Sequence, residues 1–198
     1  IINNIDFSKN VNSELYTFHP GFISDGKIQA NYEKKNYDFN FSNNLTNKNL
    51  AFELMLNSLK KIIKYAKFKK MKIAIETEGS VKKSNYLMMQ RPIEYEKLFK
   101  TYPENLFINF NISHSYFASK VFKFSLSNFI KKIKKKVVAV ELSCNDGIND
   151  NHSAISNHSR NLKYLKYFYD IPIILEFRNT SFDKLKNSII ILKKNLYK

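Results

Sequence analysis

The sequence contains a single cysteine, Cys144, which excludes an internal disulfide and fits a reducing compartment. No apolar run approaches the roughly 18 residues that a membrane-spanning helix needs. The first ten residues also lack the basic and apolar regions of a signal peptide. These absences lead us to expect a cytoplasmic protein that has no membrane partner.

Arginine is scarce as well, because only three of the 33 basic residues are arginine. A net charge of +16 would ordinarily indicate a nucleic-acid partner. Proteins that recognise nucleic acids rely on arginine, however, whose planar guanidinium makes two-point contacts with phosphate and guanine. The lysines here accompany abundant asparagine, so we interpret the charge as a bias of composition and expect no nucleic acid. Their densest cluster, "IKKIKKK" at 130–136, is interpreted as the solvated face of a helix.

Nucleotide-binding motifs are missing too. Neither G-x-G-x-x-G nor a P-loop occurs, so we expect no nucleotide cofactor. No internal repeat is present. The 198 residues suffice for one sizeable core, and we therefore expect a single domain over 1–198. The sequence indicates no oligomeric state.

Apolar strands alternate with amphipathic helices along the chain. Runs rich in Ile, Val and Phe predict buried parallel strands at 15–19, 72–76, 106–110, 137–142 and 171–177. Apolar residues spaced three and four apart predict helices at about 48–69, from Pro92 to 102, and from Phe182 to 196. The Asn- and Tyr-rich segment before position 48 is expected to be an exposed excursion.

This order of elements indicates the α/β class with a parallel sheet. The last four strands start about 30 to 35 residues apart, the length of one strand-helix unit, which suits a barrel or an open doubly wound sheet. A TIM-type (β/α)8 barrel needs around 250 residues. Because this chain is roughly two units shorter and begins at Ile1 rather than methionine, we expect a barrel that lacks its first one or two strands.

A polar residue closes each predicted strand. These residues are His19, Glu76, Asn111, Glu141 and Glu176. In a parallel barrel all such ends point to one face, where barrels of this type carry their chemistry. Three of the four glycines, at positions 21, 79 and 147, fall in the loops that follow. We therefore expect a functional site at this face.

The histidines support the same place. A single histidine is usually structural, but three of the four lie near predicted strand ends. His19 ends a strand, His114 lies three residues after Asn111, and His152 lies two residues after Asp150. Their shared position favours a site over three unrelated structural residues.

Five segments resemble successive strand ends of the xylose-isomerase-like barrels, a superfamily of sugar-phosphate isomerases and epimerases that also includes endonuclease IV. The resemblance covers about 15–195 in the right order. The segments are "FHPGF" (18–22), "IAIETEGS" (73–80), "FNISHSYFAS" (110–119), "ELSCNDGINDNH" (141–152) and "PIILEF" (172–177).

The resemblance implies a metal site. In the sugar-active members a Glu, an Asp, a His and a Glu hold a divalent metal, and these positions correspond to Glu76, Asn111, Glu141 and Glu176. The middle two depart from the family pattern, yet the formal charge of the set stays at about −3. Four oxygen ligands would favour Mn or Mg over Zn. The alternative is that the site no longer binds a metal.

The resemblance also implies residues that bind substrate. His114 matches the histidine of a D-x-x-H pattern and would contact substrate hydroxyls, as would His19. Asp150 and His152 resemble a D-x-H pair that binds a further zinc in endonuclease IV. In sugar-active relatives this pair would orient the loop or the substrate.

The implied activity is isomerisation or epimerisation of a small sugar or sugar phosphate. Glu76 and Glu176 would remove and return a proton beside a carbonyl, while a metal or His114 stabilises the enediolate. The amino-acid sequences of these segments most resemble those of superfamily members from bacterial surface-carbohydrate pathways. Two alternatives stay open. One is an endonuclease-IV-like nuclease for abasic DNA, which the positive charge favours, and the other is a barrel that has lost catalysis and serves in binding.

Overall fold

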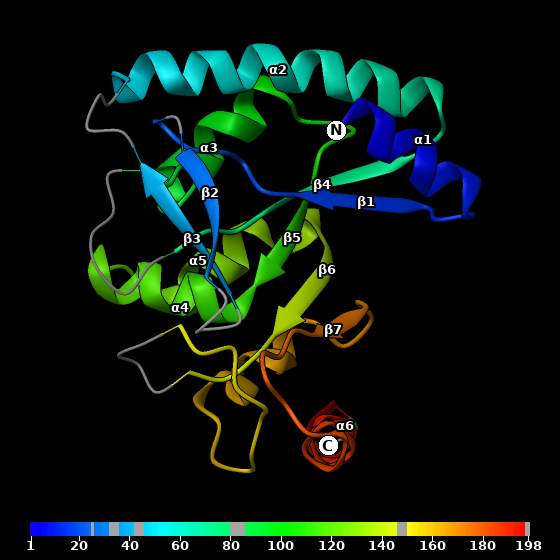
Figure 1. Ribbon diagram of the computed structural model, residues 1–198, viewed down its shortest axis with the longest axis vertical. Coiled ribbons are helices and arrows are strands. Elements are labelled where there is room, and N and C mark those ends of the chain that lie inside the picture. Colours follow the sequence, from blue (N-terminus) through cyan, green and yellow to red (C-terminus); the bar gives the residue numbers. More distant parts are fainter. Residues whose placement is uncertain (25, 32–35, 42–45, 80–85, 146–149, 197–198) are drawn as a thin grey trace.

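A five-stranded parallel sheet forms the centre of the computed structural model, which describes residues 1–24, 26–31, 36–41, 46–79, 86–145 and 150–196 (Figure 1). The strands are β1 (Leu15–Phe18), β4 (Lys72–Glu76), β5 (Phe107–Asn111), β6 (Val137–Leu142) and β7 (Ile173–Leu175). All five predicted strands are confirmed, each within two residues at its ends.

The order of the strands in the sheet identifies its type. Neighbours follow chain order, β1-β4-β5-β6-β7, and every pair is parallel. A doubly wound sheet reverses direction at a switch point, whereas a barrel adds each strand beside the previous one. The predicted fold class is confirmed, because these strands form part of a TIM-type barrel.

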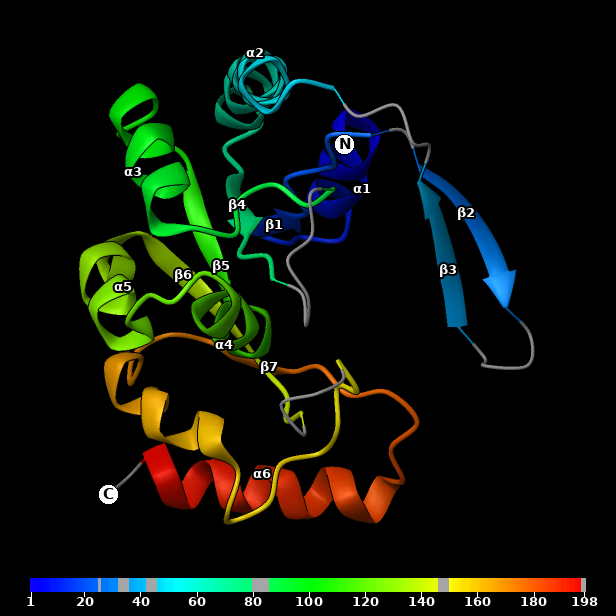
Figure 2. The same ribbon diagram turned by 90° about the vertical axis from the view of Figure 1, so that its left-hand side faces the viewer.

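Helices line one side of this curved sheet, and Figure 2 shows α2, α3 and α5 along it. The helices predicted near 48, 92 and 182 are confirmed as α2, α3 and α6. The helices are α1 (Ile2–Asn10), α2 (Lys48–Phe68), α3 (Pro92–Thr101), α4 (Ile112–Val121), α5 (Leu126–Ile133) and α6 (Phe182–Leu196), with short 3-10 helices η1 (Lys134–Lys136) and η2 (Arg160–Tyr167).

The apolar stripe of α2 packs into the core. Met55, Leu59 and Ile62 are buried, at the spacing of three and four that predicts the helix. Asn47 caps the first turn, because its side-chain oxygen accepts a hydrogen bond from the backbone N–H of Asn49 at 2.9 Å. Sequence pattern and packing therefore agree for this helix.

The apolar stripe of α6 is buried only in part. Leu192 is buried, whereas Phe182 is 68% exposed. The contact face centres on Ser188, whose hydroxyl donates to the carbonyl of Ile155 at 3.3 Å. The periodicity locates this helix correctly, but its buried face also includes a polar residue that periodicity does not reveal.

Helix α1 and strands β2 and β3 lie where the sequence predicts no helix or strand. Helix α1 has Ile5 as its one buried residue, so it lacks the periodic apolar face that reveals a helix. Strands β2 (Gly26–Asn31) and β3 (Asn36–Phe41) pair in antiparallel fashion. Figure 2 shows this pair standing apart from the five-stranded sheet, within the segment expected to be an excursion.

The lysine cluster of 130–136 lies on the surface, as predicted. Ile130 and Ile133 are buried on one face of α5, while Lys131 and Lys132 between them are exposed. In the part of the chain that the structure describes, no helix combines the length and apolar character needed to cross a membrane. The single domain over 1–198 stays a prediction.

Candidate functional site at the carboxyl ends of the strands

The polar residues of four strand ends meet at one point. The side-chain nitrogen of Asn111 lies 3.0 Å from a carboxylate oxygen of each of Glu76, Glu141 and Glu176. Glu76 ends β4, Asn111 ends β5, Glu141 lies in β6 and Glu176 follows β7. The structure thus brings together the four residues predicted as metal ligands, and we call them the hub.

The amide of Asn111 is held with its nitrogen toward the glutamates. Its oxygen accepts a hydrogen bond from the backbone N–H of His114 at 3.1 Å and so caps α4. Because an amide nitrogen carries two hydrogens, it cannot satisfy three carboxylates at once. Burial, together with the negative charges of Glu76 and Glu176, raises the pKa of Glu141 to about 7. Glu141 is therefore the hub carboxyl that is protonated most readily.

Buried hydroxyls fix the backbone of Asn111. Its N–H donates to Thr77 Oγ1 at 2.9 Å, and that hydroxyl donates to the carbonyl of Asn111 at 3.2 Å. The hydroxyl of Ser115 donates to the same Thr77 oxygen at 2.9 Å. Since Thr77 follows β4 directly, these bonds tie the ends of two neighbouring strands together and hold the hub amide in place.

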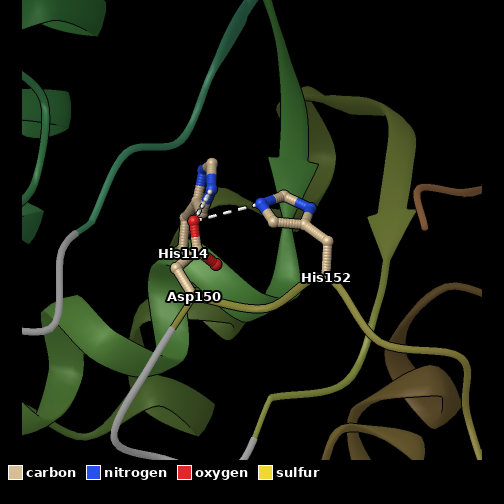
Figure 3. A group of neighbouring side chains, drawn as sticks. All are labelled: His114, Asp150 and His152. Carbon is tan, nitrogen blue, oxygen red and sulfur yellow. Dashed lines mark hydrogen bonds and ion pairs between the residues drawn. The ribbon is translucent and has the colours of Figure 1, made fainter. Parts of the chain in front are cut away.

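Beside the hub lie His114, Asp150 and His152, which we call the His-Asp-His cluster (Figure 3). Oδ2 of Asp150 lies 3.0 Å from Nε2 of His152 and 3.5 Å from Nε2 of His114. The two imidazole rings meet edge to face, with their centroids 5.4 Å apart. One ligand atom from each of the three residues lies within 4.8 Å of the other two, so all three can bind one metal ion.

Each histidine of the cluster also contacts a hub glutamate. Nδ1 of His114 lies 3.3 Å from Oε1 of Glu76, and Nδ1 of His152 lies 3.0 Å from Oε2 of Glu176. Because Asn111 contacts both glutamates, these contacts close into a ring. Its members in order are Asn111, Glu76, His114, Asp150, His152 and Glu176.

Charges in this ring stabilise one another. Burial disfavours the charged histidines, but hydrogen bonds to carboxylates outweigh it and raise the pKa of His152 to about 9 and that of His114 well above its usual value. Burial disfavours the charged acids too, yet the histidines hold the pKa values of Asp150, Glu76 and Glu176 below their usual range. In the absence of a metal, three carboxylates therefore face two imidazolium groups at neutral pH.

The backbone of His152 adopts an uncommon conformation, with φ at 44° in the left-handed region. Its carbonyl accepts a hydrogen bond from the N–H of Arg178 at 2.9 Å. The next residue, Ser153, exchanges two backbone hydrogen bonds of 2.8 and 2.7 Å with Cys144. These contacts hold the buried imidazole in the ring. Gly147, predicted to serve this loop, lies outside the described residues.

His19 lies at the rim of the site, with its side chain 62% exposed. Its Nδ1 is 2.6 Å from Oε1 of Glu78 and 3.5 Å from Oε2 of Glu76. The hydrogen bond with Glu78 raises the pKa of His19 to about 9. The sequence predictions do not include Glu78, although its spacing of two from Glu76 places both on one side of an extended chain.

Gly79 allows the segment after β4 to pack closely against α4. A Cβ atom at Gly79 would lie 1.9 Å from the carbonyl oxygen of His114, a distance that no side chain tolerates. This glycine, predicted to lie in a loop after a strand, therefore helps to position a member of the His-Asp-His cluster.

Comparison with solved structures identifies the fold. A D-tagatose 3-epimerase-like protein matches 100% of this chain and 67% of its own, with a TM-score of 0.71 and 21% identity. A 3-keto-D-glucoside 4-epimerase from E. coli matches 98% of this chain and 68% of its own, with a TM-score of 0.64 and 12% identity. The fold is that of the xylose-isomerase-like barrels. A xylose isomerase domain protein from Planctomyces limnophilus (TM-score 0.58, 12% identity, 99% of this chain and 62% of its own) agrees with this.

The xylose-isomerase-like barrel is present here in part, since the chain spans about two thirds of the length of these structures. One further match, the IolI protein with zinc, covers 98% of this chain and 65% of its own at a TM-score of 0.58 and 14% identity. No protein-family model and no curated protein sequence matches the chain. Identities this low establish the fold, so the chemistry is argued below from the residues of this chain.

The His-Asp-His cluster fits a divalent metal better than the hub does. Asp150 Oδ2 lies 3.0 and 3.5 Å from the two histidine nitrogens, close to the roughly 3.3 Å between ligands of a tetrahedral zinc ion, and all three ligand atoms lie within 4.8 Å of one another. Nδ1 of each histidine lies 3.3 or 3.0 Å from a glutamate oxygen, as an ion-pair contact rather than an aligned hydrogen bond, on the side where metal-binding histidines commonly have a carboxylate partner. In the hub, by contrast, Asn111 presents N–H rather than oxygen. Metal binding by Glu76, Asn111, Glu141 and Glu176 stays a prediction.

Proposed function

We propose that this chain carries the active site of a sugar or sugar-phosphate isomerase or epimerase. The observation that carries the proposal is the pair Glu76 and Glu176, which approach the same Asn111 nitrogen from different strands. Each oxygen lies 3.0 Å from that nitrogen, so the two carboxylates lie within twice that distance of each other. Two carboxylates at this separation can remove a proton from a carbon beside a carbonyl and return it.

The protonation states suit this chemistry. Burial disfavours the charged forms, but contacts with His114 and His152 lower the pKa values of Glu76 and Glu176, so both are ionised bases at neutral pH. Glu141, with a pKa raised to about 7 by burial and by its acidic neighbours, is partly protonated and can donate a proton. His19 is exposed at the rim, where it can contact substrate hydroxyls.

A divalent metal would be held by His114, Asp150 and His152 in this proposal. When bound, such an ion would polarise the substrate carbonyl and stabilise the negative charge that develops on its oxygen. Two nitrogen ligands and one oxygen ligand suit zinc better than Mn or Mg, which reverses the preference expected for four oxygen ligands. Glu76 and Glu176 then orient the two imidazoles as well as facing the substrate.

The test is an exchange experiment that needs no knowledge of the product. The protein is incubated in D2O with a panel of aldoses and ketoses, free and phosphorylated, and NMR follows deuterium entering the carbon beside the carbonyl. We expect exchange with at least one sugar, and a loss of about 10²–10⁴-fold in Glu76→Gln and Glu176→Gln. Glu96→Gln is the control, because Glu96 is an exposed partner of Lys132. Unchanged exchange in the first two variants would refute the assignment.

A nuclease acting at abasic DNA sites is the second candidate. The His-Asp-His cluster and the net charge of +16 favour it. Zinc-dependent cleavage of a duplex with one abasic site, with no sugar exchange, would support the nuclease. If neither activity is detected, with or without zinc, the result would support a barrel that serves only in binding.

A further inference from the structure

Glu78 is a buried carboxylate that the proposed proton transfer does not use. Its side chain, two residues beyond the end of β4, is only 8% exposed. In the part of the chain that the structure describes, no lysine or arginine forms an ion pair with it. Its partners are two histidines of the site, with Oε1 2.6 Å from Nδ1 of His19 and Oε2 3.9 Å from Nδ1 of His114. Burying a carboxylate is costly unless it accepts hydrogen bonds, so the contact with His19 offsets that cost.

The backbone on both sides of Glu78 is fixed. Its N–H donates to the carbonyl of Met89 at 3.4 Å, and the hydroxyl of Tyr95 in α3 donates to the same carbonyl at 2.6 Å. The next residue, Gly79, packs against the carbonyl oxygen of His114 in α4. Two helices therefore hold the segment that carries Glu78, and its carboxylate is a rigid support for whatever it contacts.

His19 has no comparable support of its own. It follows β1, and its side chain is 62% exposed. Both contacts of its ring run through Nδ1, which lies 2.6 Å from Oε1 of Glu78 and 3.5 Å from Oε2 of Glu76. Among the described residues, Nε2 of His19 contacts no protein group. An exposed imidazole without a partner samples several rotamers, so the short bond to Glu78 selects one of them.

We propose that Glu78 is a positioning residue, which holds the imidazole of His19 at the rim of the site so that Nε2 binds a substrate hydroxyl. This role rests on the proposed function, because it concerns how that same site takes up its sugar. Glu78 acts through His19 rather than on the substrate, since its side chain is buried and its Oε1 is occupied by Nδ1. The bond also determines which ring nitrogen meets the substrate, because Nδ1 is held and Nε2 is left open.

This role affects substrate binding more than the chemical step. A contact with a hydroxyl away from the reacting carbon is made equally in the bound substrate and in the transition state, so its loss raises KM and leaves kcat unchanged. Ordering one side chain in advance is worth roughly 3- to 10-fold in affinity. Glu76, by contrast, faces the reacting carbon, so its loss lowers kcat.

The test follows deuterium exchange against sugar concentration, which gives kcat and KM separately. We expect Glu78→Leu to raise KM by roughly 3- to 10-fold, with kcat within about twofold of the wild type. Glu78→Gln keeps an acceptor oxygen for Nδ1 and should restore most of the affinity. His19→Ala should raise KM as well, and adding Glu78→Leu to it should raise KM no further, because Glu78 acts through His19.

Glu94→Gln is the matched control. Glu94 is also a buried glutamate, 4% exposed, but its Oε2 accepts from the backbone N–H of Arg91 and caps α3. Its loss should lower the unfolding midpoint and leave KM unchanged. Equal rises of KM in Glu94→Gln and Glu78→Leu would reveal a merely structural role and overturn the proposal. A loss of kcat in Glu78→Leu as large as in Glu76→Gln would contradict it too, as would an undiminished effect of Glu78→Leu in the His19→Ala background.

NMR of the His19 ring, in chelator and without sugar, separates failure of this role from failure of the isomerase. Couplings and NOEs should show one ring rotamer in the wild type and averaging in Glu78→Leu, with Glu78→Met measured in its place if the leucine variant does not fold. A ring that is averaged in the wild type, or equally fixed without the carboxylate, overturns the positioning role whatever the exchange shows. A ring fixed by Glu78 in a protein that exchanges no sugar supports the positioning of His19 and contradicts the isomerase.

Discussion

The side-chain nitrogen of Asn111 lies 3.0 Å from a carboxylate oxygen of Glu176, although 65 positions separate the two residues in the sequence. This contact joins β5 to the segment after β7 across the end of β6. It also places an N–H group against the negative charge of the hub, in addition to the two imidazolium groups that contact Glu76 and Glu176. The first prediction tests that role.

Asn111→Asp should destabilise the protein in the presence of chelator. An aspartate can still cap α4, but it replaces the N–H donor by a fourth carboxyl at the hub, at a cost on the order of 3 kcal/mol. Because the new set contains four acids, Mn or Mg should restore much of the loss. Urea unfolding with chelator and with each metal measures both effects. An Asn111→Asp protein as stable as the wild type in chelator would contradict this role of the amide.

One zinc ion per chain should bind at the His-Asp-His cluster. His114→Gln and Asp150→Asn remove ligands and should each weaken binding by more than about 100-fold. Glu76→Gln removes only the carboxylate behind His114, so a loss of about 10–100-fold is expected. Competition with a coloured chelator gives the constants, and His158→Gln serves as the control outside the cluster. Equal zinc affinity in His114→Gln and His158→Gln would exclude this site.

Stability of the metal-free protein should fall as pH rises from about 6.5 to 9. The pKa of His152 is raised from 6.5 to about 9 in the folded chain, despite burial, by Asp150 and Glu176. Its stabilising contribution is therefore complete below 6.5 and is lost as pH passes through 9. Glu141 acts in the same direction up to about pH 7, since its folded pKa is also raised. The lowered pKa values of Asp150 and Glu176 limit stability in acid instead.

Urea unfolding at constant ionic strength across this pH range measures the effect. We expect a loss of about 2 kcal/mol, after allowance for solvent screening. His152→Asn should flatten the profile above pH 7, whereas a substitution of the exposed His158 should not. A wild-type profile that rises between pH 6.5 and 9 in chelator would show that the histidine is not held charged by the ring.

Gly79→Ala should lower both stability and zinc affinity. The added methyl group collides with the carbonyl oxygen of His114, so α4 must shift, at a cost of about 1–3 kcal/mol. Gly21→Ala provides a contrast, because its Cβ meets nothing within 4 Å and only its φ of 101° is unfavourable. That variant should lose stability without any change in zinc affinity. If the two variants bind zinc equally, Gly79 does not position His114.

The strand ends could be predicted from sequence because two local signals coincide there. A buried parallel strand reads as an apolar run, and the polar residue that closes it stands out, as Glu76 does after "KIAI". The parallel arrangement then brings such residues to one edge, as it brings Glu76, Glu141 and Glu176 to Asn111. Fold class and hub membership needed no knowledge of long-range contacts.

The rest depended on features that local patterns do not encode. The direction of the Asn111 amide is set by its bond to the N–H of His114. The contacts of Asp150 and His152 with His114 depend on where His152 lies. Its carbonyl is held by the backbone N–H of Arg178, which follows β7. The buried residue Ile5 reveals α1 only once its packing is known. In each case the deciding partner is a tertiary or backbone contact.

The closed ring of contacts has a consequence for folding kinetics. Its members are carried by β4, β5, the segment after β6 and the segment after β7, so the ring closes only when β7 has paired with β6. Until then Glu176 makes none of its ring contacts, whereas Glu76 can already contact Asn111 and His114 within β4, β5 and α4. Stabilisation that arrives after the transition state slows unfolding and leaves the folding rate unchanged. Contacts of Glu176 that form after the transition state would therefore lengthen the lifetime of the assembled strands without changing how fast they assemble.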